Sequence, residues 1–102
     1  MFSWLSAKKS EEFGSELATL LMELMPNDLT LSEGKRLSKS NYAKDKMQKR
    51  ITQFKQKEIL NFYKIAKLLN TFKWTLKDAG YDPSFTDDFT KWILISLQSK
   101  SN

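Results

Sequence analysis

The sequence predicts an all-α protein, an irregular four-helix bundle with one long central helix that is either straight or kinked. Apolar residues recur at steps of three and four, which is the period of a helix, and no segment keeps the alternation of a strand. Only three Gly and two Pro interrupt the 102 residues. With 40% hydrophobic and 13% aromatic residues, the chain has enough apolar side chains for the core of one domain over residues 1–102.

The first helix is expected at residues 10–25. Ser10 is a suitable N-cap, because its hydroxyl can accept a hydrogen bond from a free backbone N–H of the first turn, and Pro26 ends the segment. Gly14 is expected to weaken the first turn. The apolar residues of one helical face are Phe13, Leu17, Leu20, Leu21 and Leu24.

A short second helix is expected at residues 31–38. Thr30 and Glu33 have the spacing of a capping box, in which the hydroxyl and the carboxylate each accept a hydrogen bond from a backbone N–H. The polar cluster at 38–41 favours side-chain hydrogen bonds to the local backbone over a continued helix. We therefore expect this helix to end before Tyr42.

The third and longest helix is expected at residues 42–79, a segment without Gly or Pro that ends at Gly80. Its apolar stripe consists of Met47, Ile51, Phe54, Phe62, Ile65, Leu69, Phe72, Leu76 and Ala79. A straight helix of this length spans about 57 Å, whereas a domain of about 100 residues has a radius of gyration near 13 Å. The helix therefore bends or breaks near Glu58 or at Asn70–Thr71, or its N-terminal half projects from the bundle.

The last helix is expected at residues 85–98, after Pro83. Ser84 or Thr86 is the expected N-cap, and the acidic residues that follow are placed favourably at the positive end of the helix dipole. The expected buried face consists of Phe89, Trp92, Ile93 and Leu97.

The net charge of +5 is distributed unevenly along the chain. Residues 34–77 contain thirteen Lys and Arg against two acids, whereas residues 1–33 contain two Lys against six acids. On a helical wheel of residues 42–79, a basic row lies opposite the apolar stripe and has two aromatic residues at its edge. The row and these two aromatic residues are the predicted partner-binding residues: Lys46, Lys49, Arg50, Lys57, Lys64, Lys67, Tyr63 and Trp74.

This basic row predicts an acidic macromolecular partner, either nucleic acid or protein. Lys and Arg side chains bind phosphates with release of counterions, and aromatic rings beside them can stack on unpaired bases. The alternative is a protein-binding adaptor, inhibitor or immunity-type regulator that acts through a helical surface. An internal explanation also stays open, since acids of the first helix can lie alongside the row and compensate it. These acids are Glu11, Glu12, Glu16 and Glu23.

The chain contains neither Cys nor His. It therefore lacks the usual nucleophile, the usual general base and the ligands of structural zinc sites. We expect a non-enzymatic binding protein with no cofactor, no metal and no small-molecule substrate. The segment that starts at Asp82 does not match a calcium-binding loop, because Asp87 stands where Gly is needed and Ile93 stands where Glu is needed.

The longest apolar runs are far shorter than a membrane span, and the first residues lack the pattern of a secretory signal. A cytoplasmic location is therefore expected. Phe2, Trp4 and Leu5 form a small apolar group, which we expect to pack onto the bundle in preference to making peripheral membrane contact. The sequence leaves the oligomeric state open.

Overall fold

The structure, a computed structural model, describes residues 7–27 and 32–99 and places most of them in four α-helices. The helices are α1 (Lys8–Leu24), α2 (Glu33–Lys57), α3 (Phe62–Asp78) and α4 (Pro83–Gln98). No strand occurs within these two ranges. The predicted all-α class and irregular four-helix bundle are confirmed, and the long helix is α2, with 25 residues.

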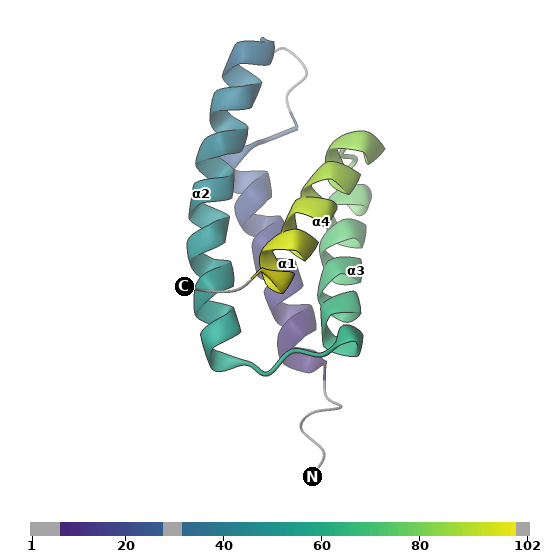
Figure 1. Ribbon diagram of the computed structural model, residues 1–102. Helices are drawn as coiled ribbons and strands as arrows, with labels where there is room; N and C mark the ends of the chain where they lie inside the picture. The colour runs from purple at the N-terminus through teal and green to yellow at the C-terminus, as the bar shows by residue number, and fades with distance from the viewer. Residues whose placement is uncertain (1–6, 28–31, 100–102) are drawn as a thin grey trace.

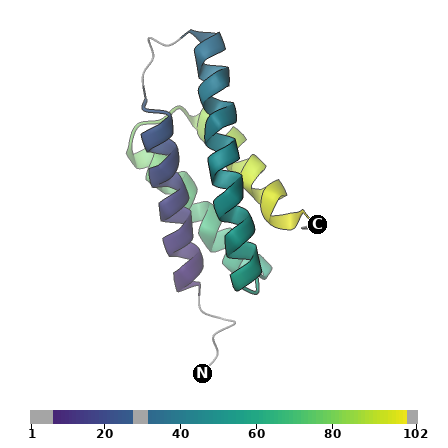
Figure 2. The ribbon, with the colours of Figure 1, turned by 90° about the vertical axis from the view of Figure 1, so that its left-hand side faces the viewer.

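Helices α1 and α3 form the most extensive helix pair of the bundle, and α2 packs against α1. Helix α4 crosses the bundle and contacts α3 and, over a shorter stretch, α2 (Figure 1). Figure 2 shows α1 and α2 side by side, with the first turns of α2 extending past the end of α1. Within the described residues, the side of α3 that carries Tyr63 and Trp74 is exposed.

All four helices contribute to one hydrophobic core. Its buried apolar residues are Phe13, Leu17, Ala18, Leu21, Met25, Ala43, Met47, Ile51, Leu68, Phe72, Leu76, Tyr81, Phe89, Ile93 and Leu97. The rings of Phe13 and Phe54 stack with their centroids 4.2 Å apart and join α1 to α2. The Tyr81 hydroxyl donates to the Met25 carbonyl at 2.7 Å, which ties the α3–α4 connection to the end of α1.

Helix α2 begins at Glu33 and continues past the polar cluster at 38–41, so the predicted short helix at 31–38 is wrong in extent. The N-cap is Ser32, whose hydroxyl accepts from the Lys35 N–H at 3.3 Å; the predicted cap Thr30 lies outside the described residues. The helix continues because no Gly or Pro follows Gly34 in this segment and because later turns are buried in the core.

The segment predicted as one helix at 42–79 is broken, and of the alternatives left open, a break near Glu58 is the one observed. Helix α2 ends at Lys57, Glu58 has an extended backbone, and α3 starts at Phe62. The side chain of Asn61 caps the new helix by accepting from the Lys64 N–H at 2.8 Å. The break shifts the buried face of the second half, so that Leu68 is buried and Phe62 is exposed.

The remaining helix ends differ from the predictions by a few residues. Helix α1 starts at Lys8, with no side-chain hydrogen bond from its N-cap, and Ser10 is buried within the first turns. Helix α4 starts at Pro83, and its cap is Asp82, which accepts from the Phe85 N–H at 3.1 Å. Proline is favourable at this first position because the N–H that it lacks has no partner inside the helix.

The end of α3 follows the prediction. Gly80 has a φ of 84°, the left-handed conformation that glycine adopts without steric cost. The Tyr81 N–H donates to the Leu76 carbonyl and the Gly80 N–H donates to the Lys77 carbonyl. These two bonds form a Schellman motif, and the hydrophobic ring of Tyr81 packs beneath it.

Candidate functional site

The break between α2 and α3 divides the predicted basic row between two helices, and its members fall into different surroundings. Arg50 and Lys57 do not lie opposite the core: they line a groove between α1 and α2. Arg50 reaches this groove because it follows Met47, which is fully buried, by three residues, so it lies at the edge of the buried face of α2. The predicted position of these two residues on an outer row is therefore wrong.

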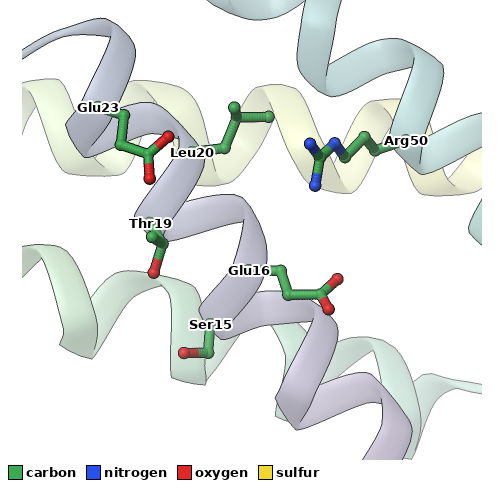
Figure 3. A pocket seen from close by; sticks show the side chains of 6 residues that line it. All are labelled: Ser15, Glu16, Thr19, Leu20, Glu23 and Arg50. Atoms are coloured by element: carbon green, nitrogen blue, oxygen red, sulfur yellow. The ribbon is translucent and has the colours of Figure 1, made fainter.

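The α1–α2 groove has acids on one wall and bases on the other. Figure 3 shows the carboxylate of Glu16 directed toward α2 and the guanidinium of Arg50 directed toward α1. Glu23 lines the same groove from α1, and Lys57 lines its continuation from α2. Since the two signs of charge are present in equal number, the groove does not favour an anionic partner.

Two further basic residues of α2 hold α4. The Lys44 ammonium lies 5.4 Å from the ring centroid of Phe89 and 5.8 Å from that of Trp92. The Lys55 ammonium donates to the Ser96 carbonyl at 2.9 Å and also to the Ser99 carbonyl. A positive charge at the carboxyl end of α4 is favourable for the helix dipole. These lysines therefore stabilise the fold.

Lys46 and Lys49 remain on the exposed surface of α2. The Lys46 ammonium lies 5.3 Å from the Tyr42 ring centroid. Lys49 forms an ion pair with Asp45 at 3.7 Å, one helical turn earlier. Lys46 and Lys49 can thus reach a partner, but the carboxylate of Asp45 already pairs with Lys49.

Lys64 is buried, with 6% of its surface exposed, and its ammonium donates to the Ile59 carbonyl at 3.2 Å. It closes the turn between α2 and α3. The prediction that Lys64 belongs to an exposed partner-binding row is wrong, because the break turns this position toward the bundle.

The outer face of α3 presents the most distinctive exposed surface of the described residues. We call it the α3 face, and it consists of Tyr63, Lys67, Asn70, Trp74 and Lys77. These positions are three or four apart, so they follow one side of the helix. Tyr63 is 52% exposed and Trp74 is 53% exposed. The sequence from residue 62 to residue 77 contains no acid.

The rings of the α3 face are held by their polar neighbours. The Lys67 ammonium lies 5.7 Å from the Tyr63 ring centroid, and the Lys77 ammonium lies 4.8 Å from that of Trp74. The Trp74 indole N–H donates to the Asn70 side-chain carbonyl at 3.1 Å. Because these contacts restrict the rings before any partner arrives, less conformational entropy is lost on binding.

Of the predicted partner-binding residues, the structure brings Tyr63, Lys67 and Trp74 together on the α3 face. Asn70 and Lys77 were missed. Their spacing from Trp74, four residues before and three after, is visible in the sequence.

No family model, no curated protein and no solved structure matches the chain. The α3 face is therefore interpreted from its own chemistry. Within residues 7–27 and 32–99, no helix is long and apolar enough to cross a membrane. The same residues contain no group of three or more Asp or Glu side chains placed to hold a metal ion.

Proposed function

We propose that the protein is a non-enzymatic nucleic-acid-binding protein that contacts single-stranded RNA or DNA through the α3 face. The observation that carries this proposal is the alternation of two half-exposed aromatic rings with two lysines on one helical face that lacks acids. Lysines bind phosphates with release of counterions, and rings stack on bases whatever their identity. A cytoplasmic location is part of this proposal.

The dimensions of the α3 face suit a short stretch of one strand. Tyr63 and Trp74 are eleven residues apart, which corresponds to about 16 Å along a helix. This distance equals about five stacked nucleotides at roughly 3.4 Å each. The two rings can stack only on bases that are unpaired, because a duplex exposes the edges of its bases and buries their faces. A preference for single strands therefore follows from the proposal.

The test is fluorescence anisotropy of a labelled oligothymidine of about 20 nucleotides, titrated with protein at several salt concentrations. Trp74→Ala is expected to weaken binding about 5- to 150-fold, because stacking contributes roughly 1–3 kcal/mol per base. Lys67→Gln and Lys77→Gln are each expected to lower the slope of log K against log salt by about 0.7, the value for one phosphate contact on a single strand.

The matched control is Lys39→Gln, which removes the same charge from an exposed position on the projecting part of α2. It should leave both the affinity and the salt slope close to those of the wild type. Absence of binding at about 50 mM salt would rule out the proposal, as would equal losses in Lys39→Gln and Lys77→Gln. The protein-binding adaptor, inhibitor or regulator would then be the remaining interpretation.

A further inference from the structure

The turn between α2 and α3 exposes two large apolar side chains at one end of the bundle. Ile59 is 86% exposed and Phe62 is 83% exposed, more than any other large hydrophobic residue that the structure describes. We call these two residues the apolar tip. Leu60, between them, packs against the core, so the turn directs one apolar side chain inward and two outward. Exposed apolar patches of this kind mark interaction sites.

The apolar tip is held by several contacts with the bundle. The Lys64 ammonium donates to the Ile59 carbonyl at 3.2 Å, and the Asn61 side chain accepts from the Lys64 N–H at 2.8 Å. Lys9 of α1 forms an ion pair with Glu58 at 3.5 Å. These contacts fix the turn, so the exposure of the two side chains is a feature of the folded structure.

Lysines flank the apolar tip. Of the four Lys between residues 55 and 67, Lys57 and Lys67 are available to a partner, since Lys55 holds the end of α4 and Lys64 is buried. The single acid in this range, Glu58, is paired with Lys9. The start of α1, where Lys8 and Lys9 are followed by Glu11 and Glu12, lies at the same end of the bundle (Figure 1). In contrast, the segment that ends α3 and begins α4 is rich in acid, with Asp78, Asp82, Asp87 and Asp88.

We propose that the apolar tip docks onto a membrane surface that contains anionic lipids. Ile59 and Phe62 enter the boundary between head groups and acyl chains, and the Tyr63 hydroxyl stays at the level of the head groups. Lys57 and Lys67, on either side of the turn, face the lipid phosphates. This combination of apolar side chains with a basic rim is the one that anionic bilayers bind.

Other occupants fit these observations less well. A second copy of the chain would bring the same basic residues together, and two side chains cover far less than the roughly 600 Å² per partner that a stable interface needs. A nucleic acid offers an aliphatic side chain such as Ile59 little apolar area, limited to base faces and thymine methyl groups.

The test is cosedimentation of the full chain with vesicles of phosphatidylcholine and phosphatidylserine mixed about two to one, and with vesicles of phosphatidylcholine alone. The wild type is expected to bind the anionic vesicles strongly and the neutral ones weakly. The double variant Ile59→Ser, Phe62→Ser is expected to lower the partition coefficient about 30-fold or more, because two apolar side chains no longer leave water. Ile95→Ser, at a 65% exposed position on α4, is the matched control and should bind as the wild type does.

Insertion is measured directly with Phe62→Trp, whose added emission should shift to the blue on anionic vesicles and be quenched by brominated lipids. The proposal would be overturned if the double variant bound anionic vesicles as the wild type does, whether or not it lost oligonucleotide binding. It would also be overturned if the wild type were a dimer in solution and the double variant a monomer. The proposal is separable from nucleic-acid binding, since Trp74→Ala should keep vesicle binding while it loses oligonucleotide binding.

Discussion

Gly14 of α1 lies so close to α3 that a β-carbon at position 14 would stand 2.4 Å from the carbonyl oxygen of Leu68. Glycine therefore permits the close approach of the two helices that form the most extensive pair in the bundle. From the sequence alone, Gly14 was expected only to weaken its helix, since glycine disfavours helix by about 1 kcal/mol relative to alanine. The structure shows that helix propensity and packing act in opposite directions at this position.

We predict that Gly14→Ala lowers the free energy of unfolding by about 1–3 kcal/mol, because the backbone of α3 must move away. Gly34→Ala is the matched control, since nothing lies within 4 Å of a β-carbon placed there. It should be neutral or raise the free energy of unfolding by up to about 1 kcal/mol. Urea unfolding followed by circular dichroism measures both, and a stabilised Gly14→Ala would show that the close approach is unimportant.

Periodicity predicted the number of helices and most of the core, because burial of an apolar face is the main determinant of where a helix packs. It offered a break near Glu58 as one of several alternatives but could not select it. Asn61 has the residue type of an N-cap, but an Asn inside a long apolar pattern also fits a helix interior. The choice depends on the parallel packing of α3 against α1, a long-range contact that local patterns do not contain.

The same break explains how much of the candidate site was predictable. Tyr63, Lys67 and Trp74 were identified because they lie on one helix, and a helical wheel is reliable within one helix. Lys64 lies after the break, which turns it toward the bundle. Arg50 lies within α2 and is at the edge of the buried face because it follows Met47 by three residues. The predicted row is thus divided: Arg50 and Lys57 line the α1–α2 groove, Lys64 closes the turn between α2 and α3, and Lys46, Lys49 and Lys67 stay on the surface.

Because Lys55 contacts the end of α4, we predict that removing its charge lowers the free energy of unfolding. Lys55→Met keeps most of the aliphatic stem but removes the hydrogen bonds to the Ser96 and Ser99 carbonyls. We expect the free energy of unfolding to fall by about 1–3 kcal/mol, the range for hydrogen bonds from a charged group. Lys57→Met, which removes a charge from an exposed position two residues later, should change it by less than about 0.5 kcal/mol. Equal effects in the two variants would contradict the role given to Lys55.

Burial raises the pKa of the Tyr81 hydroxyl, which donates to the Met25 carbonyl. A raised pKa in the folded state means that folding favours the neutral phenol. Its contribution to stability is complete below the unfolded pKa of about 10 and is lost as the pH rises through the folded pKa.

We therefore predict that the wild type loses stability above about pH 10 relative to Tyr81→Phe, which has no hydroxyl to ionise. At neutral pH the variant should be less stable by about 0.5–1.5 kcal/mol, because the Met25 carbonyl loses its donor. Urea unfolding of both proteins at about pH 8 and about pH 11 measures the change. A constant difference between the two proteins would mean that folding leaves the pKa of the Tyr81 phenol unchanged.

The first turns of α2 are predicted to be the least protected helical segment of the described chain. None of the residues 33–42 is buried, whereas Ala43, Met47 and Ile51 are completely buried in the turns that follow. Helical hydrogen bonds that lack tertiary packing open easily, since most helical stability in proteins comes from the buried face. We expect amide exchange to be fast at 33–41 and slow at 43–54 and 64–76. Hydrogen exchange followed by mass spectrometry measures the protection of each segment. Uniform protection over the whole of α2 would show that its projecting turns are packed against something in solution.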